Sequence, residues 1–366
     1  MSTQPNILLI TSDQQRFDTI GDDAPSFLRT PHTTNMLREG IQFTRAYADA
    51  PLCGPSRVTI MTGKHAFTHG MFDNGNTSDF IDRTKSLPGL LNQAGYQTAA
   101  IGKMHFEPQR ARHGFQEMII PEDYYREMSQ SGHNLQPMRH GLGQNEVYPG
   151  MATVPESQTL TSWTAERCVD YIRERRDTTM PFFLWCSFTK PHPPYDPPEP
   201  YYSMYRNSPI PEPVLSEWST DENCPETIKR FRQQQGYDLV PPEVIKEARS
   251  AYYGLITQID YNIGRIFSAL QDKNLFNETL IIYASDHGDY LGDHRTAAKG
   301  QFHESSAHVP FVVRLPKSWD NRQHDTQVDT PVSLADILPT IVSAAGGTVP
   351  SEVDGSDLIA MARREK

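Results

Sequence analysis

Short apolar runs bounded by turn residues recur along this 366-residue chain, and they constrain its fold more than any other feature. Runs this short and this rich in Ile, Leu, Val and Phe are typical of buried strands in a parallel sheet. Segments with helical spacing of apolar residues separate them, which predicts an α/β fold with a mainly parallel central sheet sandwiched by helices. The predicted strands are residues 6–11, 98–102, 181–188, 279–284 and 309–314, and the predicted helices are residues 161–175, 243–272 and 333–345.

Charged or metal-binding side chains directly follow four of these predicted strands. Ligands of open α/β sheets bind beyond the carboxyl ends of the strands. We therefore expect these side chains to converge at one edge of the sheet, although each of them alone would be unremarkable. The strand ends carry Asp13 with Gln14, Lys103 with His105, His192, and Asp286 with His287.

Asp13 and Asp286 follow apolar runs, where an unpaired carboxylate is costly to bury. Two carboxylates brought to one point repel each other unless a cation lies between them. With Gln14 and His287 beside them they form a candidate divalent-metal site, and mostly oxygen ligands favour Ca²⁺, Mg²⁺ or Mn²⁺ over zinc. The alternative is that each aspartate only caps the turn that follows it.

Cys53 lies in the strongest local motif, Pro51-Leu-Cys-Gly-Pro-Ser-Arg57. Pro55 suits the first turn of a helix and Gly63 suits its end. Cys53 is therefore predicted at a helix N-terminus, where free N–H groups favour an anion. A lone cysteine is more often a small buried hydrophobic residue, so the position alone leaves that alternative open.

Cys53-x-Pro-Ser-Arg57, followed by a short helix and Thr-Gly, resembles the signature of the sulfatase family, in which the cysteine is oxidised to Cα-formylglycine (3-oxoalanine). The Asp-Gln pair, the Gly-Lys-Met-His-Phe sequence and the His-Gly-Phe that follows are most similar to the choline-sulfatase and phosphonate monoester hydrolase branch. The resemblance implies an alkaline phosphatase-like fold with Ca²⁺ as the first choice of metal. It continues in order along nearly the whole chain, through Asp13-Gln14, Gly102-Lys103-x-His105, Pro191-His192, Ser285-Asp286-His287-Gly288 and Lys299.

Carried over position by position, the resemblance implies a mechanism for sulfate ester hydrolysis. A hydroxyl of hydrated formylglycine at position 53, polarised by the metal and held by Arg57, would attack sulfur. Charged groups would bind the sulfate oxygens and protonate the departing alcohol. A base would then remove the proton from the second hydroxyl, so that sulfate leaves and the aldehyde is regenerated. The oxygens would be bound by Lys103, His192 and Lys299, with His192 or Lys299 as the acid and His105 as the base; the metal ligands would be Asp13, Gln14, Cys53, Asp286 and His287.

Asn74 falls where this branch of the family places a substrate-binding asparagine. Asp73-Asn74-Gly75 is also a turn signature, so a purely structural role remains an alternative for it.

Two long segments, residues 106–160 and 189–241, are rich in Pro, Tyr, Arg, Gln and Asn and show little periodicity. Loops of this length usually have a function, so we expect them to cover the site within one catalytic domain, residues 1–366. The chain ends soon after residues 353–355, where members of the family continue into a smaller antiparallel subdomain. We therefore expect that C-terminal subdomain to be missing or truncated.

Composition excludes several classes of function. The 45 acidic residues exceed the 34 basic ones, which disfavours a nucleic-acid partner. The four cysteines form no CxxC pair, which disfavours a disulfide or zinc framework. No apolar run approaches the ~20 residues of a membrane span, which disfavours a membrane partner. Without a recognisable signal peptide, a cytoplasmic location is expected.

The sequence thus predicts a sulfuric ester hydrolase whose partners are a small sulfate ester and a formylglycine-generating maturation enzyme, with oligomer formation left open. A phosphonate or phosphate mono- or diester hydrolase using the same site is the first alternative, because the two tetrahedral groups are alike in size. A catalytically silent sulfatase-like protein is the second.

Overall fold

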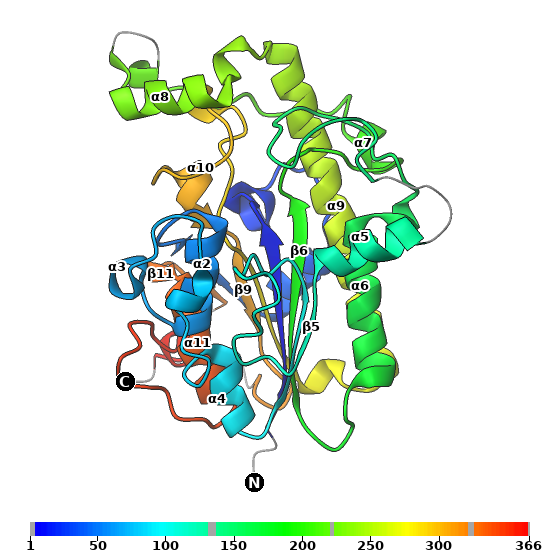
Figure 1. Ribbon diagram of the computed structural model, residues 1–366, viewed down its shortest axis with the longest axis vertical. Coiled ribbons are helices and arrows are strands. Elements are labelled where there is room, and N and C mark those ends of the chain that lie inside the picture. Colours follow the sequence, from blue (N-terminus) through cyan, green and yellow to red (C-terminus); the bar gives the residue numbers. More distant parts are fainter. Residues whose placement is uncertain (1–3, 131–136, 220–222, 321–325, 365–366) are drawn as a thin grey trace.

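A computed structural model of the chain describes residues 4–130, 137–219, 223–320 and 326–364 (Figure 1). Its centre is an eight-stranded sheet with the strand order β10-β2-β9-β7-β1-β6-β4-β5. The four strands at its heart, β7, β1, β6 and β4, are mutually parallel, so the predicted fold class is confirmed. The strands are β1 (Asn6–Asp13), β2 (Ile41–Phe43), β4 (Gln97–Gly102), β5 (Glu117–Ile119), β6 (Phe182–Pro191), β7 (Thr279–Ser285), β9 (Phe311–Arg314) and β10 (Gln327–Val328).

Helices bury both faces of this sheet, which is why its central strands carry apolar side chains on both faces. Ile7 and Leu9 of β1 pack into one core, while Leu8 and Ile10 pack into the other. Figure 1 shows one set of helices on each side of the sheet. The first core lies beneath α2 (Cys53–Thr62), α4 (Leu87–Gln93) and α11 (Ile337–Ala344), and the second lies beneath α1 (Pro31–Glu39), α6 (Leu160–Asp170) and α9 (Pro242–Asp272).

The prediction of one parallel strand over residues 309–314 is wrong. β9 runs antiparallel to β7 and β2. Val309 belongs instead to β8 (His308–Val309), which pairs with β3 (Ala46–Tyr47) in a small three-stranded sheet completed by β11 (Val332–Ser333). Pro310 separates the two strands because it has no N–H to donate to a ladder. No long crossover helix is then needed between β7 and β9, and their connection carries site residues instead.

The predicted helices are present with small changes at their ends. Residues 161–175 form α6 and a single π-helical turn (Tyr171–Arg175), residues 243–272 form α9, and residues 333–345 form a short 3₁₀ turn and α11. The expectation of little regular structure in residues 106–160 and 189–241 is only partly right. These segments contain β5, α5 (Pro121–Gln130), α7 (Tyr201–Met204) and α8 (Glu226–Gln235), which are short and largely polar.

After α11 the chain returns to the first core through α12 (Leu358–Ala362), which buries Leu358, Ile359 and Ala362. Among the residues described, none of the helices combines the length and the apolar character needed to span a bilayer.

Candidate active site

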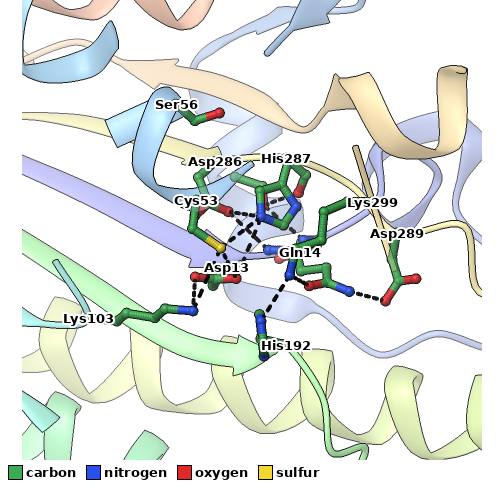
Figure 2. A network of polar contacts seen from close by, with 12 residues as sticks. Asp13, Gln14, Cys53, Ser56, Lys103, His192, Asp286, His287, Asp289 and Lys299 are labelled. Atoms are coloured by element: carbon green, nitrogen blue, oxygen red, sulfur yellow. Dashed lines mark hydrogen bonds and ion pairs between the residues drawn. The ribbon is translucent and has the colours of Figure 1, made fainter. Parts of the chain in front are cut away.

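The carboxyl ends of the central strands bring the predicted side chains together. Asp13, the last residue of β1, is in register with Pro191 at the end of β6, and Ser12 is in register with Ser285 at the end of β7. The residues after these strands therefore lie at the same edge of the sheet. The site residues meet there in Figure 2, which confirms the expected convergence.

Four buried residues form what we call the donor cluster: Asp13, Cys53, Asp286 and His287. One donor atom from each lies within 4.8 Å of the others. The Cys53 Sγ atom is 3.2 Å from His287 Nε2 and 3.7 Å from Asp13 Oδ1. The side chains of this cluster come from three separate elements, the ends of β1 and β7 and the start of α2.

Cys53 is the first residue of α2, as predicted, and Gly63 ends that helix in the left-handed region at φ 65°. Leu52 precedes the helix and offers no side-chain cap. The exposed Asn74 supplies one instead, because its Oδ1 accepts a hydrogen bond from Gly54 N at 2.9 Å. Asn74 therefore has a structural role at the helix start, and it also lines the cleft over Cys53.

The thiol of Cys53 lies in a strongly positive environment. Burial by itself would raise its pKa. The charges of Lys103, Lys299 and His287, with a hydrogen bond from His105, outweigh that cost and hold the pKa of Cys53 well below its usual value. An anion at position 53 is thus stabilised by the surrounding side chains.

Arg57, one helical turn after Cys53, joins the two carboxylates. Its Nη2 atom donates to Asp13 Oδ2 at 3.1 Å and to Asp286 Oδ2 at 2.9 Å. Its Nη1 atom donates to Ser187 Oγ at 2.9 Å and to the Lys103 carbonyl. One fully buried cation is therefore shared by two fully buried carboxylates, of which Asp13 also pairs with Lys103.

The chemistry of these groups fits a divalent cation. Burial and the charge of Asp13 raise the pKa of Asp286, whereas the cations around Asp13 hold its pKa low in spite of burial. His287 Nδ1 lies 2.9 Å from the Gly288 carbonyl and donates to it, so in the neutral ring Nε2 presents a lone pair to the donor cluster. A cation between these donors would relieve the repulsion of the carboxylates.

Lys103 and His105 follow β4 where the backbone turns sharply. Gly102 has φ 104°, and a Cβ atom there would lie 1.9 Å from the Ser187 carbonyl oxygen, so only glycine fits. The turn brings Lys103 Nζ to 2.6 Å from Asp13 Oδ2 and 3.9 Å from Cys53 Sγ. His105 is exposed and lines the cleft.

Lys299 links His192 to Gln14. Its Nζ atom lies 3.0 Å from His192 Nε2 and 2.6 Å from Gln14 Oε1. His192 Nδ1 lies 2.9 Å from the Pro193 carbonyl and donates to it, so Nε2 accepts from the lysine. Burial, followed by the charges of Lys103 and Lys299, lowers the pKa of His192 to about 4, so this imidazole is neutral.

A cleft of about 450 Å³ opens above Cys53. Its walls come largely from the two segments expected to cover the site, although residues 131–136 lie outside the described part of the chain. The residues from these segments that line it include Tyr124, Tyr125, Gln144, Asn145, His192 and Asp196.

Three polar residues of the site were not predicted from the sequence: Asp289, Tyr195 and Ser187. Asp289 is fully buried and accepts from Gln14 Nε2 at 2.7 Å and from the Tyr195 hydroxyl at 2.6 Å. Ser187 accepts from Arg57 and donates to the Lys103 carbonyl at 2.6 Å. The one available signal was the position of Asp289, shortly after the Asp286-His287 pair.

Comparisons with known proteins agree on one family. A family model described as Sulfatase matches residues 5–347. An arylsulfatase from Clostridium perfringens is 33% identical over 381 residues, covering 97% of this chain and 78% of that protein. A choline-sulfatase from Rhizobium meliloti is 28% identical, covering 98% and 71%. The structure of a phosphonate monoester hydrolase from Silicibacter pomeroyi shares the fold, with a TM-score of 0.83, 24% identity and coverage of 99% and 77%.

Proposed function

Because the chain belongs to the sulfatase family of hydrolases, we propose that it cleaves sulfate monoesters with a nucleophile made from Cys53 and a divalent cation bound beside it. The donor cluster is the observation that carries this proposal, since it places a thiol at a helix start against two buried carboxylates and an imidazole. The intact set of cations around it argues against the alternative of a silent protein.

The donor cluster and Gln14 would hold the cation, and the oxygen-rich donor set favours Ca²⁺, with Mn²⁺ or Mg²⁺ as alternatives. When bound, the cation supplies Lewis acidity to a hydroxyl at position 53 and neutralises sulfate charge. A maturation enzyme would oxidise Cys53 to formylglycine. The hydrated aldehyde offers one hydroxyl for attack and a second for release, which a serine lacks.

Lys103 and Lys299 would bind the sulfate oxygens. Their charges already lower the pKa of Cys53, so they act where negative charge grows in the transition state. His192 would bind the sulfate group as a neutral imidazole, because Lys299 donates to its Nε2 atom. Between the two acids left open by the sequence, this contact favours Lys299 as the donor of the proton to the departing alcohol.

His105 would act as the base that removes the proton from the second hydroxyl, so that sulfate leaves and the aldehyde is regenerated. Its side chain is exposed in the cleft and close enough to Cys53 to lower the pKa of that thiol, so it is within reach of a second hydroxyl at that position. Arg57 would orient Asp13 and Asp286, both of which it contacts directly, in addition to holding the attacking hydroxyl.

The alcohol half of the ester would occupy the cleft, whose walls come largely from residues 106–160 and 189–241. Asn74 also lines this cleft. We propose that these segments are insertions of a single catalytic domain spanning residues 1–366. Their tyrosine and amide side chains would select the alcohol.

Matched esters of one aryl alcohol test the proposal. The chain, produced with a formylglycine-generating enzyme, should hydrolyse the sulfate ester faster than the phosphate or phosphonate ester. Cys53→Ala should abolish turnover and leave thermal unfolding of the metal-free chain nearly unchanged, because the residue is small. A faster phosphonate or phosphodiester reaction would replace the substrate assignment, and turnover by Cys53→Ala would refute the nucleophile.

A further inference from the structure

Asp289 lies directly behind the proposed cation site without joining the donor cluster. It is fully buried and comes two residues after His287. Its Oδ2 atom accepts from Gln14 Nε2 at 2.7 Å and from the Tyr195 hydroxyl at 2.6 Å, and its Oδ1 atom accepts from Leu291 N at 2.9 Å. Figure 2 shows Gln14 between Asp289 on one side and Lys299 on the other.

These two neighbours determine which way the Gln14 amide points. The ammonium group of Lys299 has only donors, so the Gln14 atom 2.6 Å from it must be the carbonyl oxygen. Both Asp289 oxygens accept hydrogen bonds, Oδ2 from the Tyr195 hydroxyl and Oδ1 from Leu291 N, so the Gln14 atom facing Oδ2 must be the NH₂ group. The assignment of oxygen and nitrogen follows from this chemistry.

The backbone of Gln14 is fixed as well, so rotation of the amide is the remaining freedom. Gln14 has φ 72°, in the left-handed region that glycine favours. Its N–H donates to Asp286 Oδ1 at 3.1 Å, and its carbonyl accepts from the Tyr252 hydroxyl at 2.7 Å. A strained conformation of this kind persists only where several contacts hold it.

We infer that Asp289 is a positioning residue that holds the Gln14 side chain with its oxygen toward Lys299 and the cation and its NH₂ group away from them. The inference rests on the proposed function, since it assumes that a cation binds at the donor cluster. It also gives a physical reason for glutamine at position 14: a buried acceptor at position 289 requires a donor opposite it.

Asp289→Asn should turn the amide around. If the new asparagine presents its NH₂ group to Gln14, two donors face each other until Gln14 rotates and directs its own NH₂ group at Lys299 and the cation. If the asparagine amide is flipped, its NH₂ group faces the Leu291 N–H. That backbone donor cannot rotate away, so the flipped orientation is disfavoured. Partners behind metal ligands are worth about 10–100-fold in metal affinity, so the variant should bind Ca²⁺ at least about tenfold more weakly.

Replacing Gln14 by glutamate should reverse the sign of this effect. In Gln14→Glu a second carboxylate faces Asp289, and the two repel. Adding Asp289→Asn then provides a donor for the new glutamate, whose other oxygen points at the cation. Asp289→Asn should therefore weaken Ca²⁺ binding when residue 14 is glutamine and strengthen or preserve it when residue 14 is glutamate. Loss of charge alone would act in the same direction in both backgrounds.

The test is calorimetric titration of Ca²⁺ into the metal-stripped full chain, as wild type, the two single variants and the double variant. Weaker Ca²⁺ binding on Asp289→Asn in the glutamine background, with stronger or unchanged binding in the glutamate background, supports the inference. The same weakening in both backgrounds, or no effect of Asp289→Asn on a wild type that binds Ca²⁺, overturns it and leaves the proposed function standing. A wild type that binds neither Ca²⁺ nor Mn²⁺ would contradict the proposed function and the inference together.

Two control variants separate orientation from general damage. Tyr195→Phe removes one hydrogen bond to Asp289 but keeps the contact with Gln14, so it should weaken Ca²⁺ binding by less than about tenfold. Asp260→Asn makes the same chemical change at a buried carboxylate that accepts from His32 N and Thr33 N at the start of α1. It should lower stability and leave Ca²⁺ affinity unchanged; a loss as large as that of Asp289→Asn would overturn the inference.

Discussion

Arg57 sets the charge balance of the site at the scale of single residues. Its guanidinium is completely buried and contacts both Asp13 and Asp286, and Lys103 adds a second cation at Asp13. Buried ions that lose a partner are strongly destabilising, because the remaining charge is neither solvated nor paired. A divalent cation at the donor cluster would give both carboxylates a partner even where Arg57 is removed.

Replacement of Arg57 by methionine should therefore have a cost that depends on metal. In the metal-free protein we expect the free energy of unfolding to fall by about 3–5 kcal/mol, since both carboxylates lose their shared partner. With saturating Ca²⁺ the loss should be smaller. Urea unfolding of wild type and Arg57→Met, with and without Ca²⁺, measures the difference; equal losses in the two conditions would contradict this charge balance.

Sequence reasoning found those site residues whose position in the chain reveals them. Asp13 and Asp286 directly follow apolar strands, and Cys53 opens a helix marked by Pro55 and Gly63. Asp289 carries no such mark, because an aspartate in a loop after a strand is usually a turn residue. Its partner Tyr195 lies 94 positions away, and the contact between them depends on how an irregular segment packs.

At the scale of elements, α2 is held by a contact with the short helix α3 (Ala66–His69). His69 Nδ1 accepts from Met71 N at 3.1 Å, and its Nε2 atom lies 3.0 Å from Thr59 Oγ1 on α2. Burial lowers the pKa of His69 to about 4. The neutral ring is thus the one that ties α3 to the helix that carries Cys53.

This contact predicts a loss of stability in acid. Below the ordinary histidine pKa of 6.5 the unfolded chain binds a proton that folded His69 does not bind until pH falls to about 4. The stabilisation is therefore complete above pH 6.5 and is lost as pH falls toward 4. Between pH 7 and pH 5 the wild type should lose about 1–2 kcal/mol more unfolding free energy than His69→Gln. Denaturant curves at both pH values measure this, and parallel losses would show that His69 does not titrate as described.

The elements that the sequence predicted well are those with a long apolar signal. The face of α9 repeats over its 31 residues, and β1, β4, β6 and β7 are buried on both sides. Residues 309–314 were misassigned because a buried strand has the same composition whether it runs parallel or antiparallel to its neighbours. Pro310 was the only sign in the sequence that the run is divided into two strands. The short helices α5, α7 and α8 were missed because they bury few apolar side chains.

At the scale of the whole molecule, the donor cluster joins parts of the chain that are far apart in sequence. Residues 13, 53 and 286 meet although 273 positions separate the first from the last. A cation bound there would connect both halves of the central sheet to α2, and it would bind the folded chain far better than the unfolded one. The protein has a net charge of −11, so the positive environment of Cys53 is a local feature.

Metal should therefore stabilise the entire fold. At a Ca²⁺ concentration about 100 times the dissociation constant, the free energy of unfolding should rise by about 2.7 kcal/mol, and a chelator should remove the gain. Thermal unfolding with Ca²⁺ and with chelator measures the effect. Asp286→Ala, which removes one donor of the cluster, should respond to neither. A wild type insensitive to Ca²⁺ and chelator would contradict stabilisation by a bound cation, and an equal response from the variant would place the cation elsewhere.

The most direct test of the central claim is to measure turnover of a sulfate ester against the fraction of chains in which residue 53 is an aldehyde. Each sample, produced with an increasing amount of a formylglycine-generating enzyme, would be divided in two. One half would be assayed for turnover, and in the other half mass spectrometry of the peptide containing residue 53 would give the aldehyde fraction. The account predicts a rate proportional to the aldehyde fraction that vanishes when residue 53 is entirely thiol. A rate independent of that fraction would contradict it.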